Sequence, residues 1–316
     1  MLWVVIGHAG PANTLEEYPT WTTILWNFAY SFHMQLFIMI SGFLFYLTRI
    51  NNEKWSYLPM LKEKMVRFGI PFVVFTLFAM IIKSVFSSQV ERATTISFTE
   101  FFHAILYPYD GPMREFWFLG VIMWLFALYP VWKIALKNTI TIVLASVIVL
   151  AMFFVSPETN FLALHHTFIH ISFFWWGILC AKLYLRRKEV GGGKFLNTRY
   201  LLAMLGLSAI LYGVVVKFSI VYLPAVFGIL LSFSLCMLLY KIVPRLFSTF
   251  RNYTYQIYLM GLFVQELVKM IRYKMGLPFE PVYILSIIAG LYVPVMVAHA
   301  VKKINFKPLK LCIGLK

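Results

Sequence analysis

Residues 220–243 read IVYLPAVFGILLSFSLCMLLYKIV, an apolar run whose one charged residue is Lys241. A helix rising 1.5 Å per residue over this length crosses the ~30 Å hydrocarbon core of a bilayer. Eight further apolar runs predict spanning helices in the same way, at residues 22–48, 69–86, 116–132, 139–155, 168–185, 200–216, 253–271 and 282–301.

The composition of the whole chain agrees with these runs. Its 316 residues are 61% hydrophobic and 13% charged, and the mean hydropathy is +0.80. Soluble domains are about 45–50% apolar and roughly 25% charged, so a water-soluble globular protein is excluded. We expect an all-α, polytopic membrane protein with about ten transmembrane helices.

The tenth helix of this count is the segment Leu2–Gly10, which is apolar but only about half a span long. We expect it to be the remainder of a first helix whose beginning is missing from the sequence. It has no basic region or cleavage site typical of a signal peptide.

The basic residues indicate the orientation. When the connecting segments are assigned alternately to two sides, three-quarters of the 28 lysine and arginine residues fall on one side. Cytoplasmic loops carry such an excess, so this side is predicted to be the cytoplasm, and the C-terminus lies there. The net charge of +16 is therefore a topology signal, and nucleic acid is excluded as a partner.

The predicted domain organisation is simple. Residues 1–301 form one integral-membrane domain with a cytoplasmic hinge near 186–199, around Gly191–Gly193, and residues 302–316 form a short basic cytoplasmic tail. The three cysteines lie far apart and suggest neither a disulfide framework nor a zinc site.

Two histidines are candidates for catalysis, since ionisable groups inside a bilayer are costly and are functional by default. His8 lies in the outer part of the first helix, and His33 lies in the outer half of the next. At similar depths on adjacent antiparallel helices, they are placed to share one cavity, where an imidazole can accept a proton. The alternatives are a histidine that caps a helix end and a histidine bonded to a neighbouring helix.

Lys64 and Arg67 are candidates for binding phosphate. They are three residues apart and so share one helix face at the cytoplasmic end of the 69–86 run. Such a pair is suited to holding phosphate groups. The alternative is ordinary positive-inside anchoring.

A third group of candidates lies on the predicted outer side. His166 and His170 have the i, i+4 spacing of zinc ligands, but Thr167 occupies the position of the glutamate in HExxH. We therefore predict no metal site and favour contact with an external polar ligand. Glu115 and Trp117 lie at the predicted outer end of a helix, where the helix starts. They are weaker candidates for the same ligand, and helix capping is the alternative for Glu115.

Five ordered segments resemble the integral-membrane acyltransferase family 3. They are VVIGH at residues 4–8, FHMQLFIMISGFL at 32–44, KMVR at 64–67 with Ile70 and Pro71 after it, FWFL at 116–119 and YQIYL at 255–259. The similarity is closest to the fucose-4-O-acetylase-like branch, whose second helix reads FHMPLFFFISGFLF. It extends from residue 1 to about 265.

The resemblance implies a protein with ten spans that moves an acyl group, usually acetyl from acetyl-CoA, onto a sugar hydroxyl of a cell-envelope glycan. It implies that His8 is the essential first-helix histidine and that Lys64 and Arg67 act on the donor side. The chain departs from the family in three ways. An arginine eleven residues before the histidine would precede Met1, the first basic residue of RxxR is Lys64, and a late histidine is replaced by Gly261.

Our hypothesis is a multi-pass O-acyltransferase of the bacterial inner membrane, in which His8 is the general base and His33 positions the hydroxyl or stabilises the developing charge. The co-substrate is acetyl-CoA or another acyl-CoA, with no bound cofactor, and the acceptor is an envelope glycan or lipid-linked sugar. The alternatives are a transporter of polysaccharide or lipid-linked sugar without acyl chemistry and a non-catalytic subunit derived from an acyltransferase.

Overall fold

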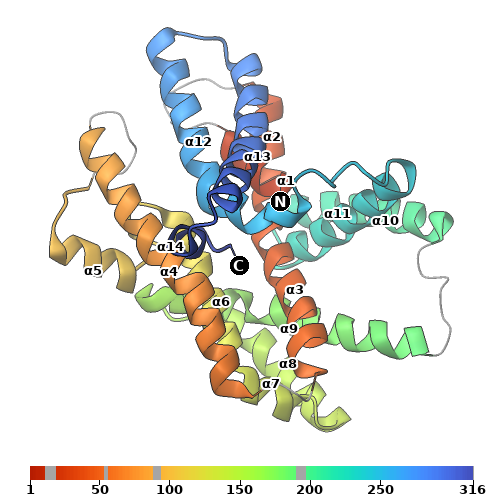
Figure 1. The fold of residues 1–316 in the computed structure, drawn as a ribbon. Coiled ribbons are helices and arrows are strands. Elements are labelled where there is room, and N and C mark those ends of the chain that lie inside the picture. The colour runs from red at the N-terminus through yellow and green to blue at the C-terminus, as the bar shows by residue number, and fades with distance from the viewer. Residues whose placement is uncertain (11–18, 53–55, 88–93, 190–196, 316) are drawn as a thin grey trace. The chain divides into compact units, whose positions relative to one another are not determined.

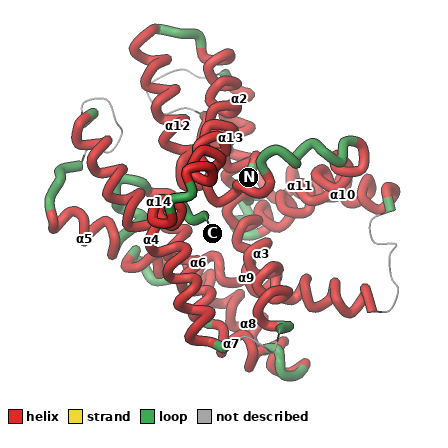
Figure 2. The backbone as a smooth tube through the Cα atoms, viewed as in Figure 1, coloured by secondary structure: helices red, strands yellow, loops and turns green. Residues whose placement is uncertain are grey.

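The computed structural model describes residues 1–10, 19–52, 56–87, 94–189 and 197–315. These residues form helices and connecting loops, with no strand among them (Figure 2). The all-α fold predicted from the sequence is confirmed. The glycines of the predicted hinge lie outside the described residues.

The helices are, in chain order, α1 (Leu2–Ala9), α2 (Thr20–Tyr30), α3 (His33–Phe45), the π-helical turn η1 (Tyr46–Ile50), α4 (Tyr57–Val85), α5 (Phe98–Leu106), the 3-10 turn η2 (Arg114–Phe116), α6 (Trp117–Ala127), α7 (Tyr129–Ala135), α8 (Thr139–Phe154), the 3-10 turn η3 (Phe161–Ala163), α9 (Leu164–Glu189), α10 (Thr198–Lys217), α11 (Leu223–Ile242), the 3-10 turn η5 (Arg251–Tyr253), α12 (Thr254–Met275), α13 (Phe279–Ile304) and α14 (Lys307–Cys312).

Six helical segments in the described ranges are long and apolar enough to cross a membrane: Thr20–Ile50, Tyr57–Val85, Phe161–Glu189, Thr198–Lys217, Leu223–Ile242 and Phe279–Ile304. A seventh candidate, α6 with α7, is bent by 54°. The other two predicted runs are also helical, but α8 is shorter, with 16 residues, and α12 carries several charged residues. The chain is therefore a multi-pass membrane protein, while the total of ten spans and the cytoplasmic C-terminus stay predictions.

Helix α4 begins earlier than its apolar run indicated. The run starts at residue 69, whereas the helix starts at Tyr57 and includes the charged stretch before the run. Lysine, glutamate, methionine and leucine are good helix formers, which explains why the helix extends beyond the apolar part. Lys64 and Arg67 thus lie within a helix that continues through Pro71.

The described chain separates into two compact units. Unit 1 comprises residues 1–36 and 187–306, and unit 2 comprises residues 37–186 and 307–316. Each unit is described by itself below. The predicted single domain over residues 1–301 stays a prediction.

In unit 1, α12 and α13 lie side by side, as do α10 and α11 (Figure 1). Gly261 permits the first contact, because a Cβ atom there would lie 2.8 Å from the Gly290 carbonyl oxygen. Gly276, with φ +61°, ends α12 in the left-handed conformation that glycine favours. The short helix α1 packs against α2, α12 and α13.

In unit 2, α3 and α9 cross closely at two glycines. A Cβ atom on Gly42 would overlap the backbone of Phe174, and one on Gly177 would overlap the backbone of Met39. Close helix contacts through small residues are typical of membrane proteins. The Trp175 indole N–H also donates a hydrogen bond to Ser146 Oγ on α8, at 2.8 Å.

Candidate functional site

The first candidate site is a cluster of three side chains in unit 1. His8, Tyr30 and His33 lie together: His8 Nδ1 and the Tyr30 hydroxyl are 2.9 Å apart, and the His8 and His33 rings are 6.0 Å apart between centroids. The Tyr30 ring lies 4.9 Å from that of His33. The two histidines that the sequence singled out are therefore neighbours, joined by a tyrosine that the sequence reasoning missed.

The protonation of His33 follows from its hydrogen bond. Its Nδ1 lies 2.7 Å from the Ala29 carbonyl oxygen. A carbonyl only accepts, so Nδ1 carries the proton, and Nε2 is an acceptor in the neutral ring. His33 is 2% exposed, and its bond to the residue four positions earlier fixes the orientation of the ring.

The position of His8 depends on anchors along α1. The Trp3 indole N–H donates to Ser232 Oγ on α11 at 2.8 Å. Gln265 Nε2 on α12 donates to the Val5 carbonyl at 2.8 Å, and the Tyr283 hydroxyl on α13 donates to the Ile6 carbonyl at 3.3 Å. Ile6 is within the last turn of α1, where carbonyls lack helical partners.

Small residues make this arrangement possible. Gly7 faces the Tyr30 ring, and a Cβ atom at Gly7 would lie 3.1 Å from it. A Cβ atom at Gly290 would lie 2.9 Å from the side chain of Gln265, so glycine there leaves room for the anchor of α1. No short motif could have signalled these contacts, because they join segments far apart in the sequence.

The predicted donor-side residues lie in unit 2, on α4. The Lys64 ammonium lies 4.6 Å from the centroid of the Phe126 ring on α6, and the Arg67 guanidinium lies 5.8 Å from that of Phe68. Both cations are half-buried. Contact with the face of an aromatic ring attracts a cation and helps to hold it in place.

The predicted acceptor-side residues form a second group in unit 2. The His166 ring stacks on Trp117 at 4.3 Å and 24°, and His170 lies 4.9 Å from Trp117. Tyr109 packs against His166 at 4.6 Å. The structure thus brings together Trp117, His166 and His170, whereas Glu115 lies on the neighbouring turn η2.

Two observations describe the chemistry of this aromatic group. His166 Nε2 is buried with no hydrogen-bond partner among the described residues, and the Arg114 guanidinium lies 4.8 Å from the Tyr109 ring centroid. No set of three or more His, Cys, Asp or Glu residues in the described ranges is placed to hold a metal ion. The group is polar, aromatic and cationic in character.

The fold and these clusters define a class: a multi-pass helical membrane protein with two neighbouring imidazoles, one of them buried. The model of acyltransferase family 3, described as an acyltransferase domain, matches residues 1–299. The chain belongs to this family, and it is a membrane acyltransferase. The comparisons with curated proteins and with solved structures gave no match.

Proposed function

We propose that the protein is an O-acyltransferase that moves an acyl group, most simply acetyl, from acyl-CoA to a hydroxyl of a cell-envelope glycan or lipid-linked sugar. Membership of the acyltransferase family supplies the reaction type. The observation that carries the proposal is the contact of His8, Tyr30 and His33 in one cluster, in which His33 is buried. The fucose-4-O-acetylase-like branch and the bacterial inner membrane belong to the same proposal.

His8 is the proposed general base. When its Nδ1 is protonated and donates to the Tyr30 oxygen, Nε2 accepts the proton of the acceptor hydroxyl. The hydroxyl oxygen then attacks the thioester carbonyl, the C–S bond breaks, and the departing sulfur takes the proton from His8. The products are the sugar ester and CoA.

His33 is the proposed positioning group. Since its Nδ1–H is engaged by Ala29, the neutral ring presents an acceptor at Nε2. An acceptor suits a hydrogen bond from the sugar hydroxyl better than stabilisation of an oxyanion, which needs a donor. The geometry therefore favours the first of the two roles expected for His33.

The remaining predicted site residues complete the proposal. Lys64 and Arg67 bind phosphates of acyl-CoA, as half-buried cations on α4. The acceptor is bound by Trp117, His166, His170 and Glu115. Aromatic faces pack against sugar rings, and a buried polar atom such as His166 Nε2 is expected to have a hydrogen-bond partner.

The test uses membranes that contain the protein, labelled acetyl-CoA and envelope glycans of the host. Label is expected to enter the glycan, and His8→Ala is expected to reduce the rate by about 10²–10⁴-fold. His103→Ala is the matched control, because His103 is an exposed histidine in unit 2. Undiminished transfer by the His8 variant would contradict the assignment, and no transfer by folded wild-type protein would favour the transporter.

A further inference from the structure

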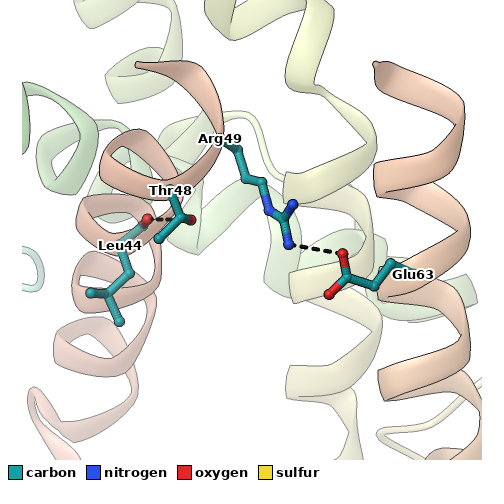
Figure 3. Close-up of polar contacts among 4 residues, drawn as sticks. All are labelled: Leu44, Thr48, Arg49 and Glu63. Atoms are coloured by element: carbon teal, nitrogen blue, oxygen red, sulfur yellow. Dashed lines mark hydrogen bonds and ion pairs between the residues drawn. The ribbon is translucent and has the colours of Figure 1, made fainter. Parts of the chain in front are cut away.

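An ion pair between a buried arginine and a half-buried glutamate lies beside the proposed donor-binding residues. Arg49 Nη2 donates to Glu63 Oε2 at 2.9 Å, and the two side chains are 8% and 30% exposed. Figure 3 shows the Arg49 guanidinium reaching from the end of the α3 helix toward Glu63 on α4. All of these residues belong to unit 2.

The local backbone brings Arg49 to this position. Residues Tyr46–Ile50 form a π-helical turn, closed by a hydrogen bond from Asn51 N to the Tyr46 carbonyl at 2.9 Å. Thr48 Oγ1 donates to the Leu44 carbonyl at 2.7 Å, a back-bond that bends helices (Figure 3). Single π turns occur frequently at functional sites.

The partner of Arg49 is adjacent to both donor-side cations. Glu63 directly precedes Lys64 and is four residues before Arg67, so Glu63 and Arg67 share one face of α4. The ion pair therefore brings a third cation, from a different helix, to the segment that carries the proposed phosphate-binding pair.

The charges and exposures indicate which partner a ligand reaches first. Removing two charges from water costs free energy that an ion pair at the surface does not lose. A pair that is largely buried is therefore weak evidence that its role is only to stabilise the fold. Glu63 is the more exposed partner, and its carboxylate, like a phosphate, is an anion that can present two oxygen atoms to a guanidinium. A guanidinium binds phosphate through paired N–H groups as it binds a carboxylate.

We propose that Arg49 is a third phosphate-binding cation of the acyl-CoA site, and that Glu63 occupies its guanidinium until the diphosphate of CoA displaces it. This inference rests on the proposed function, since it names a further residue of the same donor site. No bond is made or broken in this step; one anion replaces another on Arg49.

The experiment measures equilibrium binding of CoA, which carries no acyl group to transfer, to the purified full chain in detergent. Arg49→Gln is expected to weaken CoA binding by about 10-fold or more, because it removes a hydrogen bond to a charged group. Glu63→Gln is expected to tighten CoA binding, because it removes the competing carboxylate. Dephospho-CoA, which keeps the diphosphate, is expected to show the same two changes.

A pair with a purely structural role predicts a different result. Both variants would then shift CoA affinity in the same direction, or neither would shift it, and that outcome overturns the inference. Lys137→Gln is the control, since it removes an exposed cation of the same unit. If Arg49→Gln does not fold, Glu63→Gln decides, because weaker binding by this variant contradicts displacement.

The failures of the two proposals are distinguishable. Wild-type protein that is folded but neither binds CoA nor transfers acetyl overturns the proposed function and this inference together. Wild-type protein that binds CoA and transfers acetyl, with Arg49 and Glu63 variants indistinguishable from Lys137→Gln, overturns the role of Arg49 alone.

Discussion

At the scale of single residues, the Tyr30 hydroxyl is the proposed orienting group of His8. It lies 2.9 Å from His8 Nδ1, and its ring also contacts His33. In a base that works through Nε2, the partner of Nδ1 sets both the tautomer and the orientation of the ring.

Tyr30→Phe tests this role while keeping the ring contacts. The loss of one hydrogen bond to the imidazole is expected to lower kcat by about 3- to 10-fold. The KM for acetyl-CoA is expected to stay unchanged, because the donor-side residues are not altered. Initial rates in membranes check both values. An unchanged kcat, or a change confined to KM, would show that Tyr30 does not act through His8.

Part of this residue-scale picture followed from the sequence. His8, His33, Lys64 and Arg67 were found because ionisable groups near apolar runs are rare. Tyr30, Gln265 and Arg49 were not found, because each acts through a partner on another helix. The one local signal is the short spacing of the two residues: Tyr30 ends α2 three residues before His33, which begins α3.

At the scale of helices, the contact between α12 and α13 explains a departure from the family pattern. The resemblance to the family implies a late histidine where this chain has Gly261, and a Cβ atom there would lie 2.8 Å from the Gly290 carbonyl oxygen. The glycine is thus a packing residue in this chain. The same contact supports α1 indirectly, since Gln265 on α12 holds the Val5 carbonyl.

Gly261→Ala is expected to destabilise the protein by about 1–3 kcal/mol, since the added methyl group meets backbone that cannot move easily. Gly206→Ala on α10 is the matched control: nothing lies within 4 Å of its Cβ position. That change is expected to stabilise the helix by about 0.5–1 kcal/mol. Thermal unfolding in detergent measures both. Equal shifts in Tm for the two variants would contradict the tight packing at Gly261.

The bend between α6 and α7 is a second feature at this scale. The apolar run 116–132 predicted one helix, but the structure has two, at 54° to each other. Pro130 lies in the first turn of α7. Proline lacks an N–H and clashes with the carbonyl four residues earlier, which favours a break at this position.

At the scale of the whole molecule, membrane topology is the main prediction that awaits measurement. The alternating assignment of connecting segments predicts Lys137, before α8, on the cytoplasmic side and Glu158, after α8, on the outer side, and both residues are exposed. Its 16 residues span about 24 Å, which is shorter than a typical crossing.

Cysteine labelling in intact cells tests the topology. In a background where Cys180, Cys236 and Cys312 are serine, Glu158→Cys is expected to react with an impermeant reagent from outside. Lys137→Cys is expected to react only after permeabilisation. A variant that retains Cys312 as its single cysteine is expected to behave in the same way. The three native cysteines are not in disulfides. Labelling of both Glu158→Cys and Lys137→Cys from one side would show that α8 does not cross.

The sequence by itself determined that the chain is a multi-pass helical membrane protein and where its apolar helical segments lie, because apolar length is a local property; the start of α4 and the break between α6 and α7 came from the structure. It also carried the family, through ordered motifs with specific spacing. Only the tertiary structure decided that Tyr30 joins His8 to His33, that Trp117 stacks on His166, and that Arg49 pairs with Glu63. These contacts depend on which helices approach closely, and that is decided by small residues such as Gly42 and Gly261 packing against distant backbone.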